Sequence, residues 1–521
     1  NGVHNALVTV RTNADTAGFP FSFALSGSAN KRLVVVGDGA TLITPGDTTP
    51  SSVDGTLFTR VIVGVGAQVT RSWPVKNDGN VPLTIGSVEL SNKVDFICTT
   101  NPTGTIAPGA TGTLSLTFLP RTVGNKSSTV TLHSDDPRSP FVFTIGGEGA
   151  PRVDAEDPDI LDPTLTTVPW NPNFAGPYAA IIATPDANGR PTTPYGGGFE
   201  SFSLKADGSF SAVGTFLDQK ITIKGKIGPD GKYVGSTILP DGTLAVINLQ
   251  TKTGSDGTSR IIGTLVHNGK TWVIEAIRGL SGNIPTNMIG KYTFAIPGVE
   301  NTPDGEPSGD GVGNCTLRID GRITVKCRLA DFNAFTMTSY ITPRYQWMIS
   351  KLVQRNDGRL SGIVRFRDVP NVSDFDGILY WNKTARPDHR YFKEGFKVTR
   401  NMVGCYYTEP KGVSAISAMQ LTGDNNAVFQ IGSSAQGVPV SPKLINWGPD
   451  NRIRYTGPDV VGLRFIPSTG RISGNYTDFT SKSKVTIDGV VLQKQNRAVG
   501  LIYNYEITGY ISILPRQYTG F

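Results

Sequence analysis

Three acidic residues lie close together in the chain and could bind a metal ion: Asp304, Glu306 and Asp310. Three carboxylates within seven residues is a density that suits a hard cation such as calcium, which prefers oxygen ligands. The segment is not an EF-hand, because it lacks the bidentate Glu at the twelfth position of such a loop. A calcium loop and an ordinary solvated loop are therefore alternatives, and no other cofactor is expected.

Five aromatic residues in the second half of the chain could stack on sugars or anchor a partner protein. They are Tyr340, Tyr345, Trp347, Tyr380 and Trp381. They lie in segments of alternating polarity, and a β-strand with this pattern turns about half of its side chains inward. Each ring is therefore either a ligand or interface contact or part of the hydrophobic core.

The four cysteines contain no C-x-x-C pair, and the four histidines are too far apart in the sequence to indicate a zinc cluster. Cys315 and Cys327 flank a turn at Asp320-Gly321, so a hairpin would bring them close together. A disulfide between them and a pair of buried free thiols are both compatible with this spacing. Cys98 and Cys405 are expected to be core residues.

Motifs for catalysis are not found in the sequence. No nucleophile motif of the G-x-S-x-G type occurs. Hydrolysis of a glycan needs two carboxylates that face each other across a cleft, and sequence alone cannot pair them. We therefore predict that the chain is not an enzyme, with a secreted glycan-degrading enzyme as an alternative.

Composition favours an all-β protein. The 521 residues include 61 Gly and 35 Pro, and only 17% are charged, which is typical of many short strands joined by tight turns. The net charge of +7 is dispersed, so we expect no nucleic-acid partner, although surface glycans could be attracted. No apolar run approaches the ~20 residues of a membrane helix, so no membrane span is expected.

The beginning of the chain is similar to a later segment. Residues 5–29 and 127–150 each contain an alternating strand, a turn, a Pro-Phe pair and a second alternating strand. We therefore interpret residues 1–29 as the last strands of a preceding immunoglobulin-like domain, which upstream domains of the same polypeptide would complete. The alternative is self-assembly, in which these strands complete a sheet in a neighbouring molecule.

Turn motifs between residues 30 and 150 occur in a characteristic order. They include Lys76-Asn77-Asp78-Gly79, Ile106-Ala107-Pro108-Gly109 and Ser134-Asp135-Asp136-Pro137, with β-branched alternation between them. This pattern resembles the abnormal-spindle/hydin-like (choice-of-anchor D type) immunoglobulin-like domain of large bacterial secreted proteins. The resemblance implies a β-sandwich over 30–150 and an extracellular location.

Beyond a Pro- and Asp-rich linker at 151–175, the chain repeats itself. The tripeptides that begin at Gly176, Gly290 and Gly404 are 114 residues apart, and each ends in Tyr. This spacing predicts three β repeats, at 176–283, 284–400 and 401–515, of roughly a half-dozen short strands each. Because such a sheet has open edges, we expect the repeats to combine into one or two antiparallel barrels.

The repeat region resembles the β-barrel repeats that follow immunoglobulin-like domains in giant bacterial secreted surface proteins. The segments that carry this likeness include Pro307-Ser308-Gly309-Asp310-Gly311, Leu329-Ala330-Asp331 and Gly489-Val490-Val491-Leu492-Gln493. The resemblance implies a secreted, cell-surface location and an architecture of tandem β domains. We predict a structural or adhesive role in a filament or fibre. A carbohydrate-binding module of a secreted protein is the alternative.

Overall fold

The computed structural model describes residues 2–10, 21–37, 41–63, 68–102, 104–150, 164–282, 284–298, 305–353, 358–389, 391–410, 419, 421, 423–432, 442–504 and 508–516. These ranges contain strands and short 3₁₀ turns but no α-helix, so the predicted all-β fold is confirmed. No helix in them is long and apolar enough to cross a membrane. The chain forms two compact units, one mainly before and one mainly after Ala150, which we describe separately.

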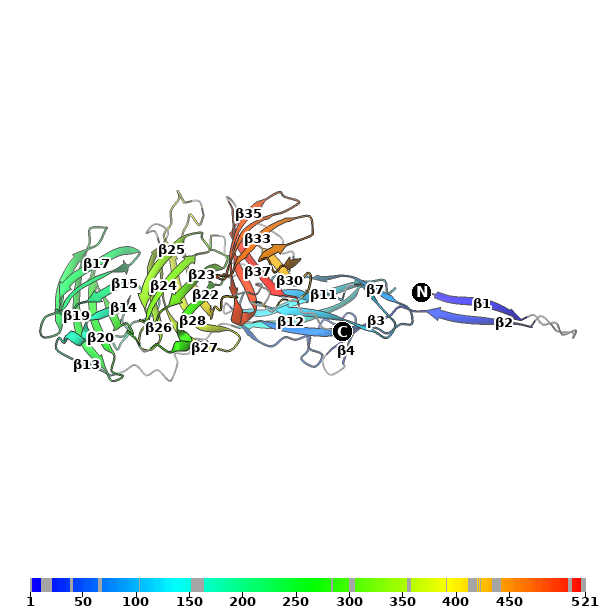
Figure 1. Cartoon of the computed structure of the whole chain (residues 1–521), viewed down its shortest axis with the longest axis horizontal. Helices are drawn as coiled ribbons and strands as arrows, with labels where there is room; N and C mark the ends of the chain where they lie inside the picture. The colour runs from blue at the N-terminus through cyan, green and yellow to red at the C-terminus, as the bar shows by residue number, and fades with distance from the viewer. Residues whose placement is uncertain are drawn as a thin grey trace. The chain divides into compact units, whose positions relative to one another are not determined.

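A hairpin opens the first unit. It consists of β1 (Gly2–Val10) and β2 (Phe21–Ala29), which pair antiparallel with Gly2 opposite Ala29. Neither strand pairs with any other described strand, as Figure 1 also shows. The Asn80 side chain donates to the Ser28 carbonyl at 2.7 Å and accepts from the Asn30 amide at 2.7 Å, which ties the end of the hairpin to the following domain.

Two five-stranded sheets follow and form the immunoglobulin-like sandwich. The first has the order β4 (Leu42–Ile43), β3 (Leu33–Val36), β6 (Val69–Asn77), β10 (Thr111–Phe118) and β8 (Phe96–Thr100). The second has the order β5 (Val61–Ile62), β12 (Phe141–Ala150), β11 (Gly124–Ser134), β7 (Leu83–Leu90) and β9 (Gly104–Ile106). The predicted immunoglobulin-like fold is thus present, and its strands span Leu33 to Ala150.

The core of the sandwich follows from strand alternation. Val130 and Leu132 in β11 are fully buried, and Phe143 in β12 lies opposite Val130. Phe143 contacts Trp73 from the other sheet in an edge-to-face arrangement, with ring centroids 6.3 Å apart. Rings from the two sheets therefore close the core between them.

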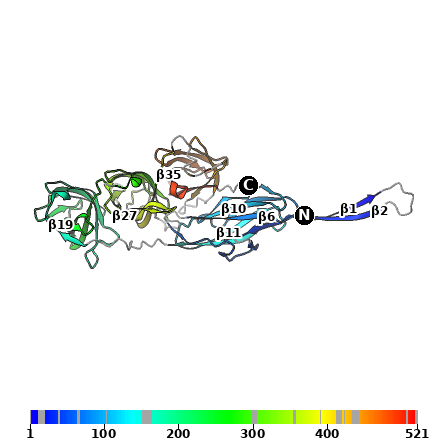
Figure 2. The same cartoon turned by 60° about the horizontal axis from the view of Figure 1, so that its bottom comes forward.

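The second unit contains three curled sheets, one for each predicted repeat (Figure 2). Sheet 1 contains β13 (Leu165–Thr167), β14 (Gly176–Ala183), β15 (Gly197–Leu204), β16 (Ser209–Phe216), β17 (Gln219–Lys226), β18 (Lys232–Ile238), β19 (Leu244–Gly254), β20 (Ser259–His267) and β21 (Lys270–Arg278). It runs β13-β19-β20-β21-β14-β15-β16-β17, with β18 also on β19. Thr237 in β18 donates to the Thr222 carbonyl in β17 at 2.9 Å, which draws the two ends together.

Sheet 2 has eight strands in the order β25-β24-β23-β22-β29-β28-β27-β26. They are β22 (Gly290–Ile296), β23 (Gly311–Leu317), β24 (Arg322–Arg328), β25 (Ala334–Tyr340), β26 (Gln346–Val353), β27 (Gly358–Val369), β28 (Ser373–Lys383) and β29 (Phe396–Tyr406). A bridge between Ile341 and Trp347 brings the two ends of this sheet together.

Barrel 3 is closed by pairing of β30 with β37. Its strands are β30 (Ala427–Gly432), β31 (Lys443–Trp447), β32 (Arg452–Arg454), β33 (Val460–Ile466), β34 (Arg471–Thr477), β35 (Lys484–Leu492), β36 (Arg497–Tyr503) and β37 (Thr508–Pro515). Short 3₁₀ turns occur at η2 (Pro172–Phe174), η3 (Thr286–Met288) and η6 (Gln493–Gln495).

Two expectations about the repeats need correction. The repeats do not combine into shared barrels, because each supplies eight or nine strands, which is enough for a sheet to curl on its own interior. The boundary expected at 400/401 falls inside β29, which belongs to sheet 2 and pairs with β22. Of the expected linker, 151–163 lies outside the described residues, and 165–167 form β13 of sheet 1.

Candidate functional site at the junctions between repeats

The aromatic residues singled out in the sequence do not form an exposed platform. Trp347 and Trp381 are 1% and 2% exposed and lie in the interior of sheet 2. Tyr345 packs against the same interior. These three rings are therefore core residues of sheet 2, which is the alternative that strand alternation had left open.

The other two aromatic residues contact sheet 1. The Tyr380 ring meets Tyr195 edge-to-face, with centroids 5.8 Å apart. Tyr340 lies so close to Gly279 that a Cβ on Gly279 would be 2.7 Å from the Cβ of Tyr340. Both tyrosines are half-buried, and they lie where two repeats meet.

The acidic set has protein partners where it is described. Asp304 lies outside the described residues. Glu306 forms an ion pair with Arg400 at 3.4 Å, and buried Asp310 accepts a hydrogen bond from the Gly298 amide at 2.9 Å. Within the described ranges no group of three or more His, Cys, Asp or Glu side chains is arranged to hold a metal ion. Calcium binding stays a prediction from the sequence.

Cys315 and Cys327 are both free thiols, so the disulfide considered for them is not formed. They lie on the adjacent strands β23 and β24 but are not opposite each other, because Cys315 pairs with Val325 and Cys327 with Gly313. Burial raises the pKa of both thiols, which keeps them protonated and unreactive. They serve as small core residues of sheet 2.

The first junction joins sheet 1 to sheet 2 through β14, β15 and β16 on one side and β25, β26 and β27 on the other. At its centre the hydroxyls of Thr215 and Ser350 are 2.6 Å apart and buried. Ser350 also donates to the Gly198 carbonyl at 3.2 Å. A Cβ on Gly198 would lie 3.0 Å from the Cβ of Ser350, so the absence of a side chain permits this close approach.

Apolar side chains on the outer faces of the strands surround this hydroxyl pair. Four of them form one buried cluster: Ala179, Ile181, Ile277 and Met348. Tyr195 and Ile363 pack against the same cluster. Because the neighbouring residues Tyr178, Ala180 and Ile182 fill the interior of sheet 1, β14 is buried on both of its faces.

Ion pairs cross the same junction. Lys351 lies 2.7 Å from Glu200, and Arg359 lies 2.9 Å from Asp218. The Asn382 amide also donates to Asp218. Burial lowers the pKa of the Arg359 guanidinium below its ordinary value, an effect that the charge of Asp218 opposes. Directional polar contacts therefore set how sheet 1 meets sheet 2.

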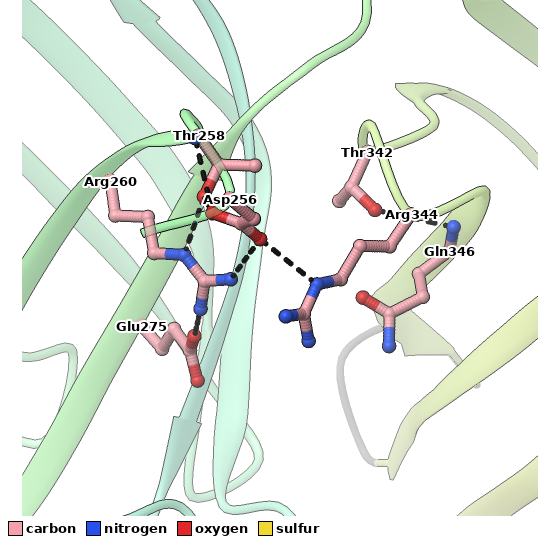
Figure 3. Close-up of polar contacts among 7 residues, drawn as sticks. All are labelled: Asp256, Thr258, Arg260, Glu275, Thr342, Arg344 and Gln346. Atoms are coloured by element: carbon pink, nitrogen blue, oxygen red, sulfur yellow. Dashed lines mark hydrogen bonds and ion pairs between the residues drawn. The ribbon is translucent and has the colours of Figure 1, made fainter. Parts of the chain in front are cut away.

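Asp256 makes a further polar link across this junction (Figure 3). It lies in the turn between β19 and β20, where its carboxylate accepts from the Thr258 amide and hydroxyl at 3.1 and 2.7 Å. Its second oxygen lies 3.5 Å from Arg260 and 3.2 Å from Arg344 of sheet 2. Burial alone would raise the pKa of Asp256, but Thr258 and the two arginines hold this pKa below its ordinary value.

The second junction joins sheet 2 to barrel 3 and is more apolar. It buries eight side chains in one cluster: Ala295, Val312, Val403, Cys405, Val490, Leu492, Val499 and Leu501. The Tyr503 and Phe332 rings, 4.7 Å apart, pack against it. As in β14, strands β35 and β36 are buried on the barrel side and on the outer side.

Polar contacts close the edges of the second junction. Asp488 of barrel 3 lies 2.7 Å from Arg328 of sheet 2 and 2.7 Å from Arg471 of its own barrel. Lys494 pairs with Asp374 at 2.7 Å. The Thr293 hydroxyl donates to a barrel carbonyl, that of Val491, at 2.6 Å. Main-chain and side-chain contacts thus both join barrel 3 to sheet 2.

Apart from Tyr340 and Tyr380, the residues at these junctions were not identified as contacts from the sequence, although a signal for them exists. Strands buried on one face alternate, whereas strands buried on both faces have continuous apolar runs. Such runs occur at 178–183, 490–492 and 498–503. They mark the strands of sheet 1 and barrel 3 that lie at the two junctions.

Comparison with known proteins supports the sandwich. Residues 61–148 match the model of the HYDIN/CFA65/VesB-like immunoglobulin-like domain. No curated protein matches the chain. A solved structure, isotype 1 transferrin binding protein B from serogroup B Neisseria meningitidis, is 12% identical and covers 83% of this chain and 89% of its own, with a TM-score of 0.16. A score this low supports no inference about fold or function.

Proposed function

We propose that this chain is a non-enzymatic structural segment of a secreted cell-surface protein, part of a fibre or adhesin built from tandem β domains. The observation that carries the proposal is the pair of junctions on sheet 2. Each buries apolar side chains from strands that are already covered on their inner faces. Such contacts join the three repeats into one stiff body, which suits a part that holds other domains apart or transmits force.

Location and partners rest on the two resemblances in the sequence. The immunoglobulin-like domain type occurs in large secreted proteins, and the repeat region resembles barrels that accompany it in giant surface proteins. Further tandem domains or copies of the chain are the expected partners, and surface glycans are a weaker candidate. The five aromatic residues first considered for sugar binding lie in the core or at a junction, so they do not favour the carbohydrate-binding alternative.

Distances between spin labels on sheet 1 and barrel 3 test this proposal. Labels would be attached to cysteines introduced at Lys224 and Lys484, which are exposed, with half-buried Cys98 replaced by Ser. A stiff body predicts a single narrow distance distribution that is unchanged by dilution. A broad distribution would contradict the proposed structural role, and turnover of a glycan by the purified chain would contradict the non-enzymatic one.

A further inference from the structure

The β1–β2 hairpin exposes large apolar side chains on both of its faces. On one face Ala6 lies opposite Leu25 and Val8 lies opposite Phe23. Leu25 and Phe23 are 51% and 39% exposed, which is unusual for large apolar side chains that share one face of a sheet. The opposite face includes Thr9, whose hydroxyl lies 3.0 Å from that of Ser22, together with Val3 and Leu7, which are 70% and 71% exposed.

The same pairing recurs in the last hairpin of the sandwich. Val8 opposite Phe23 corresponds to Val130 opposite Phe143, and Ala6 opposite Leu25 corresponds to Ser128 opposite Ile145. The separation is constant: 122 residues from β1 to β11 and 120 residues from β2 to β12. Register and side-chain pattern therefore agree along both strands, so the two hairpins are copies of one structural element.

In the sandwich this element is covered in two ways. Its apolar face packs on the opposite sheet, where Trp73 contacts Phe143 and both are buried. Its edges pair with β5 and β7. Ile145, the counterpart of Leu25, is 0% exposed. The β1–β2 copy has the same apolar face but, among the described residues, neither the opposite sheet nor the edge strands.

We propose that the apolar face of β1–β2 is the docking surface for an incomplete immunoglobulin-like module, one that has the front strands of such a sandwich but not its last hairpin. The hairpin would supply the missing strands, as β11 and β12 do for the sandwich that follows. Such a partner offers an opposite sheet of aromatic and aliphatic side chains together with two free strand edges, which are what the hairpin lacks.

The size of the surface favours this occupant over a second copy of the hairpin. Two strands of nine residues present a face of roughly 300 Å², from a rise of about 3.3 Å per residue and a strand spacing of about 4.8 Å. A stable interface buries about 800 Å² on each partner. Two hairpins packed face to face would bury well below that area. An incomplete immunoglobulin-like module would cover the face and also pair with both edges of the hairpin, and the buried area would then approach it.

The lack of charge on the hairpin and its attachment to the sandwich also favour an incomplete immunoglobulin-like module as the partner. Within the described strands β1 and β2 carry no Lys, Arg, Asp or Glu, so they offer no opposite charge to a charged group, and an uncharged partner surface fits them best. Asn80 holds the end of the hairpin against the sandwich, and a Cβ on Gly79 would lie 2.2 Å from the Asn30 carbonyl. A docked module would therefore adjoin the present sandwich directly, as neighbouring domains do in a tandem array.

A binding experiment with the whole chain tests the proposal. The probe is a polypeptide of residues 30–122 of this same chain, which carries β3 to β10 but lacks β11 and β12. Hydrogen–deuterium exchange of β1 and β2 would be followed as the probe is added. We expect exchange in both strands to slow at least tenfold. Leu25→Asp should remove this protection, whereas Ala24→Asp, on the opposite face, should keep it.

Two controls keep the result decisive. A synthetic peptide of residues 123–150 shows whether the probe can accept a closing hairpin; a probe that binds this peptide but does not protect β1–β2 overturns the proposal. If the probe binds neither, residues 5–27 are grafted in place of 127–147 in the whole chain. Loss of protection of β6 in that graft also overturns it. Dimerisation of the whole chain that Leu25→Asp abolishes would assign the surface to a second copy instead.

Discussion

Sheet 2 is held on its two sides by different chemistry. Its junction with barrel 3 buries eight apolar side chains in one cluster, whereas its junction with sheet 1 buries four. Among the described residues three ion pairs cross each junction, and the junction with sheet 1 adds a buried hydroxyl pair at its centre. Apolar burial supplies non-directional attraction, and hydrogen bonds and ion pairs supply direction. The second junction should therefore be the stronger, and the first, where polar contacts make up the larger share, should respond more to salt and pH.

The largest effect is expected from a charge placed in the second junction. Val403 is 0% exposed and belongs to its apolar cluster, so Val403→Asp would bury a carboxylate without a partner. We expect a loss of about 3 kcal/mol or more in the free energy that holds barrel 3 to sheet 2. Urea unfolding followed by hydrogen–deuterium exchange of β29 and β35 measures it. Thr399→Asp, an exposed position on the same strand, is the control and should change little.

A smaller loss is expected from the hydroxyl pair of the first junction. Ser350→Ala leaves the buried Thr215 hydroxyl without its partner, which costs about 1–2 kcal/mol. Adding Thr215→Val removes the orphaned group and should recover part of the loss, so a double-mutant cycle isolates the pair. Unfolding free energies of the two single variants and the double variant test this. Additive losses would show that the hydroxyls do not interact.

The two junctions of the unsubstituted protein should respond differently to salt. Glu200 and Lys351 are partly exposed, with side-chain exposures of 26% and 22%, so ions reach this pair. Raising NaCl from about 0.05 to 1 M shortens the screening length from above 10 Å to about 3 Å. We expect amide exchange to become faster in β15 and β26, and to change less in β35 and β36, where the ion pairs lie beside a larger apolar cluster. Equal responses at both junctions would contradict the comparison, and Lys351→Met should reduce the response of the first.

The sequence predicts local geometry better than it predicts which surfaces meet. The Asn77-Asp78-Gly79 turn is formed as expected, since the Asn77 side chain accepts from the Gly79 amide at 3.0 Å. The repeat spacing also marks three successive β units, although each curls on its own interior and does not share a barrel as expected. These features depend on side chains only a few residues apart or on a repeated pattern, and both can be found in the amino-acid sequence.

Which side chains point into the core is harder to predict from the sequence. Trp347 lies between Gln346 and Met348, so the local sequence does not show which face of the strand is buried. Trp381, between Tyr380 and Asn382, is equally ambiguous, and only the curvature of sheet 2 determines that both rings point inward. Strands β14 and β36 had a usable signal, because their apolar runs do not alternate. Which repeat covers which strand depends on contacts more than 100 residues apart, such as the one between Thr215 and Ser350, and these leave no local pattern.

The smallest of these effects is expected from acid, which should weaken the ion pair between Asp256 and Arg344 in the first junction. The pKa of Asp256 is held below its ordinary value in the folded state, so its ion pair with Arg344 contributes stability above about pH 4, the ordinary pKa of an Asp carboxyl. That contribution is lost as the pH falls through the lowered pKa of the folded state. Because both side chains are partly exposed, Arg344→Gln should cost under about 1 kcal/mol at pH 6.

Arg344→Gln keeps the Thr258 hydrogen bonds of Asp256 intact, so it isolates the link between the two sheets. Thermal unfolding of the whole chain and of this variant from pH 6 down to about pH 2.5 checks the expectation, since at the lower value the Asp256 carboxyl is largely protonated. The difference between the two melting temperatures should shrink as the pH falls. A constant difference would mean that Arg344 stabilises the junction by packing alone. The first junction would then depend no more on charge than the second, contrary to the contrast drawn between them.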